Sequence, residues 1–246
     1  LVQALGAEVP GLREFPALKG PGVAVPSSPT AMVWWLRGDE EGDLLLQARA
    51  IEKAVAPALH FHRAVDGFRY KLGASGHGHD LTGYEDGTEN PEGDDAEAAA
   101  LVQGQGAGLD GGSFVAVQQW VHDMDAFDAM ASQARDDMMG RRLSDNEELD
   151  DAPASAHVKR TAQESFTPEA FVLRRSMPWA LGHKMGLMFV AFGCTLDAFE
   201  AQMRRMAGLE DGITDGIFKI SKPVSGSYLW CPPMQGGQPD LRQIGI

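Results

Sequence analysis

Three side chains of different chemistry stand in recognisable settings along the chain. Asp86 precedes Gly87 within residues 83–91, a run of turn-forming residues where glycine lets the backbone approach a ligand closely. His157 lies in Ser-Ala-His-Val-Lys-Arg, and Arg174 lies in Val-Leu-Arg-Arg-Ser-Met-Pro-Trp. A carboxylate can accept and return a proton, an imidazole can bind a transition metal, and a guanidinium can stabilise negative charge. Taken alone, each has a plainer interpretation, because an Asp-Gly often makes a turn and a lone histidine is usually structural.

The three segments, in this order, resemble those of the dye-decolourising peroxidases, and of their bacterial P-type (B-type) branch in particular. The resemblance continues through Met185 to Cys194, the helix-like segment Leu196 to Met206, and Asp-Gly-Ile-Phe-Lys-Ile-Ser-Lys-Pro-Val from Asp215. It covers most of the chain. It implies an enzyme with one haem b per chain, with hydrogen peroxide and small aromatic reductants as its partners.

The resemblance also implies a role for each candidate residue. His157 would be the proximal iron ligand, Asp86 the distal acid–base group, and Arg174 the cation that stabilises charge as the O–O bond breaks. Asp215 would accept a hydrogen bond from His157, with Asp211 as the alternative. Further pocket residues are expected at Gly87, Ser176 and Phe189. Ser176 is a departure, because many relatives carry Asn there and a serine side chain is shorter.

Arg174 and Arg175 would point to opposite faces of a strand, and the resemblance, aligned on the following Met-Pro, favours Arg174 as the arginine in the pocket. The remaining histidines have no comparable context, and we expect them to be structural or solvent-facing: His60, His62, His77, His79, His122 and His183. Of these, the pair in Gly-His-Gly-His-Asp could hold an adventitious metal ion.

Composition narrows the classes of function. The chain has 246 residues, 43% hydrophobic and 23% charged, with a net charge of −14. Such an acidic chain argues against a nucleic-acid partner, and its acidic surface is either simply solvated or attracts cations such as Mn²⁺. Cys194 and Cys231 are far apart and suggest neither zinc nor a disulfide scaffold. No apolar run is long enough for a membrane span. We expect a cytoplasmic homo-oligomer.

Hydrophobic patterns predict strands at 31–37, 59–70, 113–122, 171–174, 185–193 and 227–230. They predict helices at 39–56, 123–139 and 196–206, with Asp123 and Thr195 as caps, a loop at 72–80, and a polar connection at 140–167. This mixture indicates an α+β fold. The resemblance implies two ferredoxin-like halves with antiparallel sheets, residues 1–95 and 96–246, joined near 90–112, with haem bound mainly by the second.

Two further expectations concern extent and function. By comparison with the family, an N-terminal strand and most of a helix would precede Leu1, so the sequence would be a fragment. Two other functions remain open beside the peroxidase. One is a haem- or porphyrin-handling protein with incidental peroxidase activity, and the other is a haem-free ferredoxin-like binding module.

Overall fold

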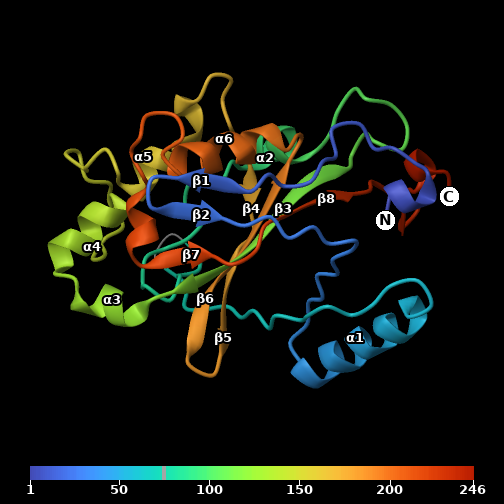
Figure 1. Ribbon diagram of the computed structural model, residues 1–246, viewed down its shortest axis with the longest axis horizontal. Helices are drawn as coiled ribbons and strands as arrows, with labels where there is room; N and C mark the ends of the chain where they lie inside the picture. The colour runs from blue at the N-terminus through green and yellow to red at the C-terminus, as the bar shows by residue number, and fades with distance from the viewer. Residues whose placement is uncertain (74–75) are drawn as a thin grey trace.

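An antiparallel sheet lies at the centre of the computed structural model, which describes residues 1–73 and 76–246 (Figure 1). Its middle strand is β3 (Ser113–His122), rich in the β-branched and aromatic residues that favour strands. One edge of β3 pairs with β6 (Lys184–Gly193), and the other pairs with β8 (Ser227–Cys231) and β7 (Ser221–Pro223). The far edge of β6 pairs with β4 (Leu173–Arg174) and β5 (Met177–Leu181). The expected α+β class with antiparallel pairing is confirmed.

One face of the sheet carries the main core. Phe114, Ala116 and Trp120 alternate along β3 and therefore point to the same face. They share a core cluster with Phe199 and Met203 of α6 (Asp197–Met206), whose apolar residues recur at helical spacing. The hairpin of β1 (Leu18–Gly20) and β2 (Val23–Val25) adds to the same cluster.

The other helices are short and lie mostly around the sheet. They are α2 (Gly93–Ala100), α3 (Met124–Ala129), α4 (Ser132–Met139) and α5 (His157–Thr161), with 3-10 turns at Gln3–Leu5, Gln163–Ser165, Gly216–Lys219 and Arg242–Ile244. A last hairpin joins β9 (Met234–Gln235) to β10 (Gln238–Pro239). Helix α1 (Glu41–Val55) is different, because it stands away from the sheet in Figure 1 and none of its 15 described residues is buried.

Several predicted elements are confirmed within a residue or two of their ends. They are the helix at 39–56 (α1), the strands at 113–122, 185–193 and 227–230, and the helix at 196–206. Asp123 is a helix cap as predicted, since its carboxylate accepts a hydrogen bond from the Ala126 N–H at 2.9 Å. The Thr195 hydroxyl accepts a long hydrogen bond of 3.3 Å from the Asp197 N–H, one residue before the position that caps α6.

Two predicted strands are wrong. Segments 31–37 and 59–70 are described in full and neither forms a strand, although Gly67 makes an isolated bridge to Trp179. A strand is stabilised by pairing with a neighbour, so an apolar extended run without one remains irregular. The predicted loop at 72–80 holds isolated bridges at Leu72, Gly78 and His79, and its residues 74 and 75 lie outside the described part of the chain.

The predicted helix at 123–139 is interrupted. Met130 and Ala131 have extended backbone with ψ of 140° and 150°, which separates α3 from α4. The polar connection at 140–167 contains α5, and the joining region at 90–112 contains α2; neither helix was predicted. β1, β2, β5 and β7 were also missed, since strands of three to five residues give little periodic signal. In the described residues, no helix combines the length and the apolar character needed to cross a membrane.

Gly186 of β6 packs so closely against the backbone of Trp120 that adding a methyl group there should destabilise the fold. A Cβ on Gly186 of β6 would lie 2.0 Å from the Trp120 carbonyl oxygen, which also accepts a hydrogen bond from the Trp179 indole. We expect Gly186→Ala to lower the free energy of unfolding by about 2 kcal/mol or more, since a rigid backbone must move. Gly42→Ala on α1 meets nothing within 4 Å and should change it by less than about 0.5 kcal/mol. Denaturant titration of both variants measures this, and similar midpoints would contradict it.

Candidate active site

The Asp86 loop is held by hydrogen bonds at Asp86 and at the residues just before it. The Asp86 N–H donates to the Gly78 carbonyl at 2.8 Å, and a hydrogen bond of 2.7 Å joins His79 Nδ1 to the Gly83 carbonyl. Gly87 has φ of +88°, a left-handed conformation that side chains with a Cβ rarely adopt. Glycine is therefore required at Gly87 by the turn itself.

Asn90 connects this loop to the strand that carries Arg174. Its Oδ1 accepts from the Arg174 N–H at 2.8 Å, and its Nδ2 donates to the Arg174 carbonyl at 3.0 Å. These two bonds reproduce what a neighbouring strand would offer to β4. Asp86 lies four residues before Asn90 in the same loop. Asn90 thus fixes the backbone of Arg174 relative to Asp86.

Gln163 makes a second connection, between the loop, the strand and the segment that follows His157. Its Nε2 donates to the Glu89 carbonyl at 2.8 Å, and its Oε1 accepts from the Val172 N–H at 2.9 Å. Gln163 is 3% exposed, so these bonds are buried. Neither Asn90 nor Gln163 was singled out in the sequence. Asn90 belongs to the recognised loop motif, whereas nothing in the local pattern distinguishes Gln163.

The side chains of Asp86, Arg174 and His157 lie close enough to affect one another's ionisation. Burial raises the pKa of Asp86, and nearby Asp80 adds to this, while the positive charges of Arg174 and His157 act in the opposite direction. Burial lowers the pKa of Arg174, and Asp86 opposes that shift. The fold therefore brings the acid, the cation and the imidazole into one poorly solvated region.

His157 is the first residue of α5, and its Nδ1 is hydrogen-bonded to Asp215 Oδ2 at 2.9 Å. The Asp215 side chain is 0% exposed, and its other oxygen accepts from the Ile217 N–H at 2.8 Å. Burial alone would lower the pKa of His157, but the charge and hydrogen bond of Asp215 raise it above its ordinary value. Asp211, the alternative partner, instead binds Arg160.

The free groups at this site suit a haem iron and a small oxygen ligand. Because His157 Nδ1 bonds to a carboxylate, the lone pair for a metal is on Nε2, which has no hydrogen-bond partner among the described residues. The His157 side chain is 29% exposed, and the low solvation around it acts to lower its pKa. The Arg174 guanidinium likewise makes no hydrogen bond with any described residue. An imidazole nitrogen with an available lone pair and a set of unused guanidinium donors thus share one region.

Three further residues considered in the sequence, Ser176, Phe189 and Arg175, make different kinds of contact. The Ser176 hydroxyl accepts a long hydrogen bond of 3.4 Å from the Val190 N–H, so it is directed at the sheet backbone. Phe189 packs against Phe199 of α6 with ring centroids 5.6 Å apart. Arg175 is exposed, whereas Arg174 is half-buried, and the Arg175 guanidinium donates to the Arg174 carbonyl at 2.8 Å.

The other histidines fall into two groups. His60, His62 and His183 are exposed, while His77, His79 and His122 are partly buried. His122 lies between Asp80 and Ser221, at 3.1 and 2.7 Å. The described residues contain no group of three or more histidine, cysteine or carboxylate side chains arranged to hold a metal ion.

Two recesses of about 410 and 320 Å³ lie beside the Asp86 loop and are both lined by Glu85, Asp145 and Asn146. Among the described residues that line them, Asp86, His157 and Arg174 are absent. Their walls are largely charged and polar, whereas a porphyrin needs apolar walls. The candidate site is therefore the region around His157 and Arg174, and not either recess.

Comparison with known proteins gives a consistent result. The family model described as "Dyp-type peroxidase, C-terminal" matches residues 77–236, which contain all four proposed polar groups. A dye-decolorizing peroxidase from Mycolicibacterium paratuberculosis is 31% identical over 227 residues, covering 90% of this chain and 63% of the relative. The chain thus spans about 63% of the length of that relative.

Solved structures agree in fold. A dye-decolorizing protein from V. cholerae superposes with a TM-score of 0.76 at 30% identity, over 92% of this chain and 74% of that one. A variant of DypB from Rhodococcus jostii, solved in complex with heme, gives a TM-score of 0.83 at 28% identity, over 94% and 74% of the two chains. With more than half of its length matched by the family model and its fold shared with solved members, the chain belongs to the Dyp-type peroxidase family.

Proposed function

We propose that the protein is a haem-dependent peroxidase that reduces hydrogen peroxide and oxidises dyes, phenols or other one-electron donors. The observation that carries this proposal is the buried His157–Asp215 hydrogen bond in the same region as Asp86 and Arg174. A ligand, a proton-transfer group and a cation are the three kinds of group that cleavage of an O–O bond at iron requires. Relatives with "peroxidase" in their names and a neighbour in complex with heme support it.

The proposed cofactor is one haem b per chain, which when bound supplies two electrons to the O–O bond and is restored one electron at a time by reducing substrates. His157 Nε2 would bind the iron, and Asp215 makes that nitrogen a stronger donor. Asp86 accepts the proton from one peroxide oxygen and returns it to the departing oxygen, which leaves as water. Arg174 donates hydrogen bonds to the peroxide and stabilises the negative charge that develops. Gly87, Ser176 and Phe189 are proposed to line the pocket.

The two-half organisation is also proposed. The second half, residues 96–246, contains β3, then helices, β4–β5 and β6, then α6 and β7–β8, a βαββαβ order that supports a ferredoxin-like unit. Residues 1–95 would form the first half and end in the Asp86 loop. A cytoplasmic location and a homo-oligomeric state are proposed on sequence grounds alone.

A haem- or porphyrin-handling protein is the competing function. Storage or transfer needs an iron ligand and an apolar slot, but no buried acid beside a guanidinium whose donors are unused. Asp86 and Arg174 therefore favour the enzyme. The haem-loaded chain, mixed with one equivalent of peroxide and then a phenol, distinguishes them, because only a peroxidase returns to its starting spectrum at the expense of the phenol.

Haem retention tests the role of His157. We expect His157→Ala to lose most of its Soret absorbance per protein after desalting, because the iron loses its one strong protein ligand. His183→Ala removes an exposed histidine and should retain haem as the wild type does. An undiminished Soret band in His157→Ala would place the ligand elsewhere.

Stopped-flow mixing with peroxide tests the two distal groups. Arg174→Leu should keep haem and slow the Soret change on peroxide addition by about 100-fold or more, since it removes the guanidinium that stabilises the developing negative charge. Asp86→Asn should slow it less, because a bound water can still carry the proton. Arg175→Leu, at the exposed neighbouring arginine, is the control. Wild-type rates in Arg174→Leu would remove Arg174 from the mechanism.

The pH dependence follows from the ionisation of Asp86. The base acts when ionised, so the peroxide reaction should slow as pH falls through a pKa that lies above the ordinary range for aspartate. Arg174 holds that pKa down, so Arg174→Leu should move the acid limb of the rate profile to higher pH. Arg175 does not act on Asp86, and Arg175→Leu should leave the limb in place. An identical limb in all three proteins would show that Asp86 is not the titrating group.

A further inference from the structure

The helix that carries His157 is too short to be stable by itself. α5 has five residues, His157–Thr161, fewer than two turns, and isolated helices of this length do not persist in water. The orientation of the His157 ring therefore depends on tertiary contacts that hold α5. Arg160, three residues after His157, makes the most extensive of these.

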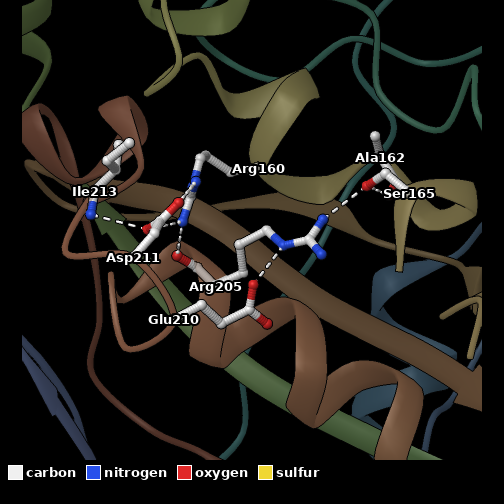
Figure 2. A network of polar contacts seen from close by, with 7 residues as sticks. All are labelled: Arg160, Ala162, Ser165, Arg205, Glu210, Asp211 and Ile213. Carbon is white, nitrogen blue, oxygen red and sulfur yellow. Dashed lines mark hydrogen bonds and ion pairs between the residues drawn. The ribbon is translucent and has the colours of Figure 1, made fainter. Parts of the chain in front are cut away.

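Figure 2 shows Arg160 enclosed between Asp211 and the end of α6. Its Nη1 and Nη2 groups donate to the two Asp211 oxygens at 2.7 and 2.9 Å, a bidentate pairing, and Nη2 also donates to the Arg205 carbonyl at 2.6 Å. The Arg160 side chain is 6% exposed and that of Asp211 is 42% exposed. A planar guanidinium paired in this way fixes direction as well as distance.

Asp211 belongs to the same loop as Asp215. Asp211 Oδ1 also accepts from the Ile213 N–H at 2.9 Å, visible in Figure 2, and the Asp215 N–H donates to the Met206 carbonyl at 2.8 Å. The first bond thus closes a turn within the loop, and the second ties the loop to the end of α6. Four residues after Asp211, Asp215 accepts the hydrogen bond from His157. α5 and this loop are therefore joined twice, by Arg160–Asp211 and by His157–Asp215.

A second arginine in the network has a different task. Arg205 donates to Glu210 at 2.8 Å and to the Ser165 hydroxyl at 2.7 Å, and its guanidinium lies 3.2 Å from the centre of the Phe166 ring. It holds the turn after α5 and makes no recorded contact with Asp211 or Asp215 among the described residues. Arg205 thus also connects this loop, through Glu210, to the chain after α5, whereas Arg160 connects it, through Asp211, to α5 itself.

We propose that Arg160, acting through Asp211, is a positioning residue that sets α5 against the Asp215 loop and so maintains the His157–Asp215 hydrogen bond. Its role toward haem rests on the proposed function of His157 as the iron ligand. The effect of Arg160 on the His157–Asp215 hydrogen bond is a property of the haem-free chain. It can therefore be tested separately from the role of Arg160 toward haem.

The first test uses the full haem-free chain. The proton on His157 Nδ1 is followed by ¹H–¹⁵N NMR, with circular dichroism to verify folding. We expect Arg160→Met and Asp211→Asn to increase its exchange with solvent by at least about tenfold, the size of effect typical of losing support around a ligand. Arg13→Met is the matched control, because Arg13 also pairs with α6 but at the opposite end, through Asp197 and Glu200. Exchange as slow in folded Arg160→Met and Asp211→Asn as in wild type would overturn the proposal.

The second test uses the haem-loaded chain and the Fe(III)/Fe(II) reduction potential. A weaker hydrogen bond makes the imidazole less electron-rich, so Arg160→Met and Asp211→Asn should raise the potential, by less than Asp215→Asn does. If Arg160 acts through Asp215, Arg160→Met should add no further rise in the Asp215→Asn background. A full additional rise there would show that Arg160 acts by another route and would overturn the proposal.

The outcomes remain separable. If Arg160→Met fails to fold, Asp211→Asn carries both tests, because Asp211 is substantially exposed and the substitution preserves its size. If the wild-type chain binds no haem, the proposed function fails, while the NMR comparison still decides whether Arg160 maintains the His157–Asp215 bond.

Discussion

Strand β3 has hydrogen-bonded neighbours along both edges, and every part of the site is positioned from it. β6 on one side carries β4, and β4 ends at Arg174. β7 on the other side follows the 3-10 turn that Asp215 begins and caps. A strand paired on both edges cannot slip by one residue without turning its buried side chains outward. The register of β3 thus fixes the distance between the two sides of the site.

The site itself concentrates charge where the protein solvates it poorly. Asp86 with Arg174, and His157 with Asp215, bring two carboxylates and two cationic groups into one region, and burial acts against the charged form of Asp86, Arg174 and His157. Such groups reduce stability unless each finds a partner. The fold tolerates them because Asn90, Gln163 and Arg160 hold the surrounding backbone. Asn90 and Gln163 bond to main-chain atoms. Arg160 bonds to the Asp211 carboxylate and to the Arg205 carbonyl.

The sequence predicted the elements whose signal is local. The apolar run at 113–122 and the helical spacing at 196–206 identify β3 and α6, because β3 is buried on both faces along most of its length and α6 buries one continuous face. Segments 31–37 and 59–70 have the composition of strands but no neighbour to pair with, and composition cannot report a neighbour. The residues of the candidate site likewise divide into those with a local sequence signal and those defined by distant partners. Motifs single out Asp86, His157 and Arg174, whereas Gln163 and Arg160 act through partners 9 to 74 residues away, and no local pattern marks them.

Helix α1 differs from the other helices in how much it contributes to the thermodynamics of unfolding. Its Leu45 and Leu46 are 62% and 65% exposed and none of its residues is fully buried, so unfolding α1 uncovers less apolar surface than unfolding a packed helix such as α6. Both the heat capacity change and the denaturant dependence of unfolding scale with newly exposed surface. α1 therefore contributes little to either quantity, and its helix–coil equilibrium is governed by its own sequence. The sheet and the helices packed on it therefore account for most of both quantities.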